Sequence, residues 1–127
     1  MNSLFLVMIG GALGAAARFQ LGGWAARVFW SGLPWGTLIV NVTGALAMGL
    51  VAALAARGLG ESGLSEGWRL FLGVGLLGGF TTFSAFSLET VMLIERGAFG
   101  WAAAYVAASV VGALAALWLG LRLGQPA

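Results

Sequence analysis

The sequence contains no histidine, cysteine, lysine or aspartate among its 127 residues. The absence of histidine and cysteine excludes most transition-metal sites and all cysteine nucleophiles, and it removes the usual general base. Without cysteine there is no disulfide framework, so the sequence does not indicate a redox compartment. An enzyme would have to rely on serine or threonine hydroxyls with a glutamate. We therefore expect no catalytic function.

Charge is also scarce. Charged residues make up 8% of the chain and hydrophobic residues 61%, whereas about a quarter of a soluble domain is charged. The six arginines are spread singly along the sequence, which is unlike the basic patch of a nucleic-acid-binding protein. The expected partners are membrane lipid and further copies of this chain, with no nucleic acid.

Four apolar stretches approach the roughly 20 residues that a helix needs to cross a bilayer. They cover residues 4–22, 36–56, 69–94 and 99–120. No basic residue precedes the first stretch, which argues against a cleaved signal peptide and predicts a retained helix. The sequence predicts an all-α membrane protein with one four-helix transmembrane domain over residues 1–127.

The segments between these stretches differ in composition. Residues 23–34 contain several aromatics and Arg27, a mixture that suits the headgroup layer, so we expect this segment to lie along the interface. Residues 57–68 are the most polar and predict a loop, and residues 122–127 predict a free tail. Within the first stretch, Gly10 and Gly14 form a small-xxx-small pair, which predicts close contact with another helix.

The third stretch contains Gly78-Gly79 followed by hydroxyl residues among phenylalanines. The four hydroxyl residues are Thr81, Thr82, Ser84 and Ser87. Single hydroxyls often bond back to their own helix, but a lipid-facing helix has no use for this whole cluster. Irregular backbone at membrane depth survives only where it is buried or lines a watery path. We predict a helix broken near Gly78-Gly79, whose freed carbonyls can hold a cation and whose N–H groups and hydroxyls can hold an anion.

Two further groups of residues have both a structural and a functional interpretation. Asn41 shares a helix face with Thr37, so its amide either bonds to another helix or forms part of a polar lining. Phe83 and Phe86 are three residues apart and either pack a helix or turn positive ring edges toward an anion. A site of neutral donors would hold a small anion loosely enough to release it.

Arg18 and Glu89 are the charges inside the apolar stretches, and intramembrane charges are functional-site hypotheses by default. They are expected at similar depth, so they can form an ion pair, with Arg27 and Arg96 as alternative partners for Glu89. The other interpretation is a vestibule in which Arg18 attracts anions. Proton coupling through Glu89 is a further alternative, although no second acid is expected beside it.

The arginines do not specify an orientation. Four spans place Arg57, Arg69 and Arg122 on one side and three arginines on the other. With equal numbers on both sides, the positive-inside rule favours neither orientation. Either another determinant fixes the orientation, or the chain inserts both ways. In the second case two opposed copies can pair about a two-fold axis, and the partner supplies the wall that one copy lacks.

These motifs resemble the Fluc-type fluoride channels, also called the CrcB or camphor-resistance family. The resemblance covers the whole chain and rests on the segments 10–19, 36–44 and 78–87, with Tyr105 and Ser109 at matching places in the fourth span. It implies small four-helix proteins of the bacterial inner membrane that assemble as antiparallel, dual-topology homodimers. It also implies two pores that export fluoride passively.

The resemblance also implies roles for individual residues. The pore residues would be Asn41, Phe83, Phe86, Thr37, Thr82, Ser84, Tyr105 and Ser109. The backbone carbonyls of Gly78 and Thr81 would hold a structural sodium ion between the two subunits. This sequence has Ala113 where some relatives have a further serine, and Ala85 where threonine or serine is more frequent. The alternative function is a small dual-topology exchanger coupled to protons through Glu89.

Overall fold

The computed structural model describes residues 2–30, 32–57 and 65–126. Within these ranges the chain is helical and contains no strand. The elements are α1 (Ser3–Val28), α2 (Trp35–Ala56), α3 (Glu66–Arg69), η1 (Leu70–Leu77), α4 (Gly78–Phe80), α5 (Phe83–Glu95) and α6 (Phe99–Gly124). Four helical spans, with α3 to α5 counted as one, are long and apolar enough to cross a membrane. The predicted all-α, four-span membrane protein is confirmed.

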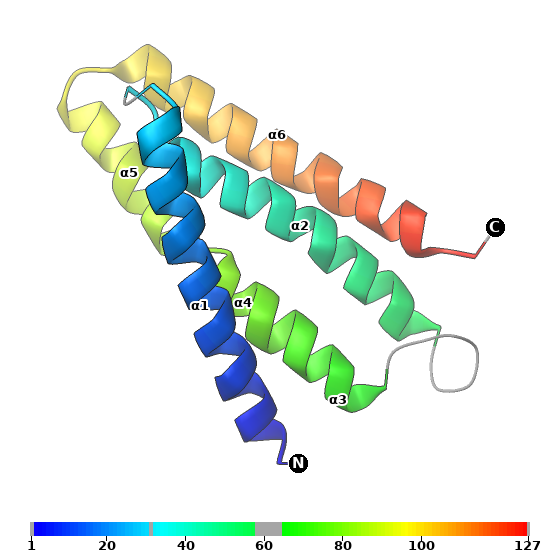
Figure 1. Cartoon of the computed structure of the whole chain (residues 1–127). Helices are drawn as coiled ribbons and strands as arrows, with labels where there is room; N and C mark the ends of the chain where they lie inside the picture. The colour runs from blue at the N-terminus through cyan, green and yellow to red at the C-terminus, as the bar shows by residue number, and fades with distance from the viewer. Residues whose placement is uncertain (1, 31, 58–64, 127) are drawn as a thin grey trace.

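The spans pack as two pairs (Figure 1). Helix α1 runs beside η1 and α4, and α2 runs beside α6. Helix α5 continues beyond the break, toward the end of the molecule where α1 meets α2. Both termini lie toward the opposite end. The break is therefore placed between the two pairs, near the middle of the molecule.

Helix α1 is longer than predicted. Residues 23–28 were expected outside the first span, but the helix continues to Val28 before an extended Phe29 ends it. That the segment 23–34 lies along the membrane interface stays a prediction. Asn2 caps its first turn by accepting a hydrogen bond from the Leu4 N–H at 2.8 Å. Gly22 and Gly23 do not stop the helix, because the α2 residue Gly36 packs tightly against Gly22. Tertiary contact overrides the weak helix propensity of glycine.

Two other predicted boundaries also change. Helix α6 reaches Gly124, so the predicted free tail is wrong at Arg122, whose side chain lies 5.2 Å from the ring centre of Trp118. The predicted loop at 57–68 is wrong at its end, because Ser65 caps a helix that begins at Glu66. Residues 58–64 of that loop lie outside the described ranges. Arg57 sits in a turn after α2, as predicted.

Glycines form the seam between α1 and the third span. A Cβ on Gly14 would overlap the Leu76 carbonyl, and one on Gly10 would meet the carbonyl of Phe71 at 2.5 Å. Gly79 contacts α1 equally closely, because its Cβ would lie 2.5 Å from the Gly11 carbonyl oxygen. The predicted close contact through Gly10 and Gly14 is confirmed. Van der Waals packing of this kind holds helices together where the surrounding solvent is as apolar as the side chains.

A second glycine seam joins α2 to α6. A Cβ on Gly49 would overlap the Leu117 carbonyl, and one on Gly120 would overlap the carbonyl of Leu46. These two helices therefore approach through their backbones at the end of the molecule farthest from the α5–α6 connection. Toward the other end, side chains of both helices line a cavity beside the break.

Candidate functional site

The third span is interrupted at Thr81 and Thr82, shortly after the glycine pair and Phe80. Thr81 has ψ 156° and Thr82 has φ −152° and ψ 121°, so both are extended. Gly78 and Gly79 are themselves helical, so the interruption begins two residues after Gly79. Before it, residues Leu70–Leu77 form a π-helix, a rare form that is frequent near functional sites. The sequence pattern did not predict the π-helix.

Asn41 bridges the interruption. Its Oδ1 accepts the Thr82 N–H at 2.8 Å, and its Nδ2 donates to the Thr82 carbonyl at 3.0 Å. One side chain on α2 thus replaces both helical partners that Thr82 loses. An unpaired backbone group in hydrocarbon costs several kcal/mol, so these bonds explain why the break lies here. The amide keeps one N–H and one lone pair free for a further partner.

The two sides of the break carry opposite partial charges. Among the described residues no hydrogen bond reaches the carbonyl oxygens of Gly78 and Thr81, because the Thr82 and Ala85 N–H groups donate to side chains instead. Beyond the break α5 begins, with Thr82 Oγ1 accepting the Ala85 N–H at 3.2 Å. A helix C-terminus favours a cation and a helix N-terminus an anion. The break therefore offers carbonyls to a cation on one side and N–H groups to an anion on the other.

The free carbonyls fit the cation that the resemblance implies. The described residues contain no group of three acidic, histidine or cysteine side chains that could hold a metal ion. A cation at the break would therefore rest on backbone oxygens, and Gly78 and Thr81 supply two without partners. Oxygen ligands suit hard cations. One chain supplies only part of a coordination shell from these two atoms.

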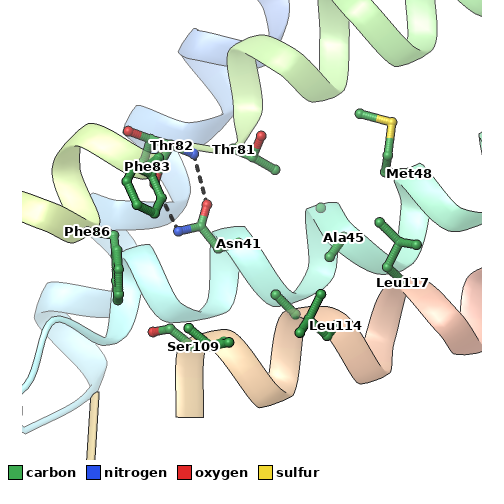
Figure 2. A pocket seen from close by; sticks show the side chains of 13 residues that line it. Asn41, Ala45, Met48, Thr81, Thr82, Phe83, Phe86, Ser109, Leu114 and Leu117 are labelled. Atoms are coloured by element: carbon green, nitrogen blue, oxygen red, sulfur yellow. Dashed lines mark hydrogen bonds between the residues drawn. The ribbon is translucent and has the colours of Figure 1, made fainter. Parts of the chain in front are cut away.

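A cavity of about 420 Å³ lies between the break and the α2–α6 pair. Figure 2 shows Asn41, Thr82, Phe83 and Phe86 at one end, with Met48 and Leu117 at the other. Its remaining lining residues are Gly44, Ala45, Thr81, Ser109, Val110, Ala113 and Leu114. Polar groups are confined to the end beside the break, and Ala113 belongs to the apolar part.

Three aromatic rings stack in sequence along this polar end. Phe83 and Phe86 have centroids 5.6 Å apart at 44°, and Phe86 and Tyr105 have centroids 5.2 Å apart at 45°. Tyr105 is 2% exposed, whereas Phe83 is 78% exposed. The row therefore runs from the core of the chain to its outer face, and the last ring lacks a covering wall within this chain.

Two hydroxyls on α6 are buried without partners. Among the described residues nothing hydrogen-bonds to Tyr105 Oη or Ser109 Oγ, although the two residues are only 2% and 6% exposed. They lie one helical turn apart, so they share a face. An unsatisfied buried hydroxyl costs about 1–3 kcal/mol. Such a pair indicates a ligand or water that completes the bonding.

Thr82 and Ser84 add hydroxyls at the start of α5. Their oxygens lie 3.3 Å apart. Ser87 bonds back to the Phe83 carbonyl at 2.9 Å, and Thr81 to the Leu77 carbonyl at 2.9 Å. Those last two hydroxyls follow the structural interpretation. Thr82 lines the cavity, whereas Ser84 is exposed and is not among its lining residues.

The ion pair considered for Arg18 and Glu89 does not form. Arg18 Nε donates to the Gly79 carbonyl at 3.2 Å, and Glu89 accepts a 2.6 Å hydrogen bond from Thr37 Oγ1. Arg27 and Arg96 do not replace Arg18, because the only ion pair among the described residues joins Arg69 to Glu66. The freed Gly79 carbonyl draws Arg18 to the break. No pattern in the sequence predicts this contact, because it depends on where the break lies.

Arg18 and Thr37 also line a cavity of about 290 Å³ that reaches Thr82 and Ala85. Thr82 lines both this cavity and the larger one. Thr37 stands between Arg18 and Glu89 without bringing the two charges together. Arg18 is the one basic residue among those that line this cavity in the described chain.

The comparisons with known proteins agree with one another. The family described as CrcB-like protein, Camphor Resistance (CrcB), matches residues 5–121. A protein of Caulobacter sp. (strain K31) is 52% identical over 98% of this chain and 96% of its own length, and one of Sphingopyxis alaskensis is 56% identical over 97% and 95%. A third, from Caulobacter vibrioides, is 54% identical over 98% and 97%. All three are named fluoride-specific ion channel FluC.

The match spans all four helices and both sides of the break, and the relatives have nearly the same length as this chain. With four membrane-crossing spans, the protein is a multi-pass bacterial membrane protein. It belongs to the CrcB-like, camphor-resistance family.

Proposed function

We propose that this protein is a passive, fluoride-selective channel that exports fluoride from the cytoplasm of a bacterium through its inner membrane. The observation that carries the proposal is the pair of buried, partnerless hydroxyls of Tyr105 and Ser109 in the described chain, beside the ring row and Asn41. Family membership and the relatives named as fluoride channels support it. In this role the protein is a channel and has no enzymatic activity.

The pore would be lined by neutral donors. Tyr105, Ser109, Thr82 and Ser84 offer hydroxyls, Asn41 has a spare amide N–H, and α5 directs its N-terminal N–H groups toward the break. Each can take the place of a water around a small anion without binding it as tightly as a full charge would. Conduction requires that binding be weak enough for the ion to leave. Larger halides would not fit such a narrow lining.

Phe83 and Phe86 would complete the lining by turning ring edges toward the ion. A ring edge carries partial positive charge. Thr37 lies at the side of this route, in the cavity that also holds Arg18. Arg18 would concentrate anions at the mouth, since a cation beside a low-dielectric wall attracts them most strongly.

The missing wall over Phe83 would come from a second copy. In an antiparallel homodimer each copy would cover the open cavity of the other, which gives two pores. The free carbonyls of Gly78 and Thr81 from both copies would then hold a sodium ion between the subunits. When bound, this ion would supply structural cohesion and a positive potential near both pores. Arg18 donates a hydrogen bond to the neighbouring Gly79 carbonyl. This contact within one chain would help to hold the same turn in place.

The direct test is fluoride efflux from liposomes that contain only the purified protein. With potassium fluoride inside and a potassium ionophore present, a fluoride electrode is expected to record rapid release without any pH gradient. Potassium chloride loading is the control and is expected to give no release. Equal chloride release would contradict selectivity.

The same assay separates the channel from the alternative exchanger. Proton coupling through Glu89 would make fluoride movement depend on a proton gradient or on a proton ionophore. We favour the channel because no second carboxylate from the described part of this chain contacts Glu89, whose one hydrogen bond there comes from Thr37. Fluoride release that stops when the proton path is blocked would support the exchanger.

Dual topology has its own test. A cysteine placed at Asn2 in this cysteine-free chain is expected to react with a membrane-impermeant reagent from both faces of sealed vesicles. Labelling from one face only would contradict the antiparallel dimer while leaving the fluoride assay unaffected.

A further inference from the structure

A cavity of about 280 Å³ lies where α1 turns into α2, beside the cavity that holds Arg18, with which it shares Gly22, Gly36 and Thr37. Aromatic rings and one carboxylate line it: Phe29, Trp30, Trp35 and Glu89, together with Thr37 and the last turns of α1 at Gly22, Ala25 and Ala26. No basic residue lines this cavity among the described residues. Its walls therefore combine apolar surface with negative charge.

Glu89 has bonding capacity left over. Its carboxylate accepts one hydrogen bond, from Thr37 at 2.6 Å, and no arginine of the described chain pairs with it. An ionised carboxylate can accept about four hydrogen bonds. A lone carboxylate in a membrane segment is costly without a partner and marks a functional site by default. The cavity gives a cation access to it.

The aromatic residues form a connected cluster at the same place. Phe29 and Trp35 have ring centroids 5.5 Å apart at 30°, and Trp24 meets Phe29 edge-on at 5.8 Å. Trp30 packs on Trp101, with centroids 5.1 Å apart. These contacts hold the rings in place, and ring faces attract cations within about 6 Å. The last turn of α1 adds the negative end of a helix dipole.

Together these features select one kind of ligand. An anion would be repelled by Glu89. A hard metal ion would need several oxygen ligands, whereas Glu89 and Thr37 are the described residues lining this cavity that carry side-chain oxygens. Carboxylate with aromatic walls is instead the arrangement that recognises organic ammonium groups. Tryptophans are also enriched at the headgroup level of membranes, where such groups are abundant.

We propose that this cavity binds an alkylammonium group, with Glu89 as its counter-ion and Phe29, Trp30 and Trp35 as its aromatic walls. The group belongs either to the headgroup of a phospholipid such as phosphatidylethanolamine or to a free organic amine. The proposal does not depend on fluoride conduction, and it is tested without fluoride.

The first experiment titrates the purified protein in a neutral detergent with tetramethylammonium chloride and follows tryptophan fluorescence. Sodium chloride at equal ionic strength is the reference. A saturable change is expected with tetramethylammonium alone. Glu89→Gln and Trp30→Leu are each expected to weaken binding about tenfold, the order expected for a partly desolvated cation–π or ionic contact. Trp118→Leu, on the distant part of α6, is the matched control and is expected to bind normally.

Size-exclusion profiles identify any variant that fails to fold. The titration of the wild-type protein tests by itself whether an alkylammonium group binds, so the proposal does not depend on the variants. No saturable response beyond that of sodium chloride would overturn the proposal. Unchanged affinity in both folded Glu89→Gln and folded Trp30→Leu would overturn it as well.

The second experiment distinguishes the two sources. Protein reconstituted in mixed phosphatidylethanolamine and phosphatidylglycerol is extracted gently, and retained lipid is measured by native mass spectrometry before and after adding tetramethylammonium. Displacement of retained phosphatidylethanolamine assigns the site to lipid. Tetramethylammonium binding without such retention assigns it to a soluble amine. If phosphatidylethanolamine is not retained and tetramethylammonium does not bind, the site is refuted.

Discussion

The third span consists of two parts that the break separates, and they are built in opposite ways. The part before the break, Glu66–Phe80, lies against α1 through glycines, with Gly73, Gly75 and Leu77 buried. The part after it, α5, buries only Leu93 and leaves Phe83 78% exposed. The first part therefore serves as scaffold, and the second presents side chains to whatever fills the site. One membrane span can thus separate stability from function at a two-residue interruption.

If the first part is scaffold, the largest effect is expected at its glycine seam. Gly14→Ala places a methyl group against the Leu76 backbone, which cannot yield as a side chain does. Overpacking of this kind costs roughly 1–3 kcal/mol or more. We expect a markedly lower melting temperature in detergent and loss of flux with it. Gly100→Ala is the control, because nothing lies within 4 Å of the added atom. Equal melting of both variants would show that the seam is not tightly packed.

The second-largest effect is expected at the break itself, where Asn41 bonds to Thr82. Asn41→Asp keeps an acceptor for the Thr82 N–H but loses the donor to the Thr82 carbonyl, and it introduces charge beside an anion path. We expect fluoride flux to fall at least about tenfold, since a hydrogen bond to a charged or buried group is worth about that factor. The protein should remain folded and dimeric by size exclusion. Thr43→Val, which removes a bond within α2 only, should conduct normally.

A smaller effect, confined to conduction, is expected beyond the break. Phe83→Ile removes a ring edge from the outer end of the ring row. Because Phe83 is 78% exposed within the chain, we expect little change in the folding of a single copy but a clear drop in fluoride efflux from liposomes. Phe19→Ile is a matched control at 80% exposure on α1. If both variants conduct like the wild type, Phe83 does not line the pore.

The smallest effect is expected at Ser109, on α6. Ser109→Ala removes a hydroxyl that has no partner among the described residues, so thermal stability should stay constant or rise slightly. Fluoride efflux should fall several-fold, less than in Asn41→Asp, because Tyr105 and Thr82 remain. Ser87→Ala is the control, since its hydroxyl bonds back to its own helix. A large loss of stability in Ser109→Ala would indicate a purely structural hydroxyl.

Much of the scaffold was predictable because hydrophobic length and small-residue spacing report directly on membrane helices. The four spans and the Gly10–Gly14 contact follow from those two signals. The predicted end of α1 was wrong, because packing of Gly36 against Gly22 carries the helix past two glycines. That the third span is interrupted was also predictable from its residue types, but the position of the interruption at Thr81 and Thr82 was not. Asn41 sets that position through contacts between distant segments.

The candidate site was predictable only in part, since three of the predicted pore residues, Thr37, Ser84 and Tyr105, do not line the cavity beside the break. Asn41, Thr82, Phe83, Phe86 and Ser109 do line one cavity. The sequence could not indicate which hydroxyls would be left without partners in the described chain, because each has a local backbone acceptor available. It also placed Arg18 opposite Glu89, whereas the free Gly79 carbonyl and Thr37 attract them separately. Such outcomes depend on competition among several partners.

The π-helix Leu70–Leu77 sets the rotational phase of everything after it. Each residue of an α-helix advances the chain by about 100°, whereas the wider turn takes up extra residues without advancing as far. If these eight residues took ordinary α geometry instead, each would advance the chain further, and Thr82 would swing around the axis, away from Asn41. The span would still cross the bilayer, with its interruption facing the wrong neighbour.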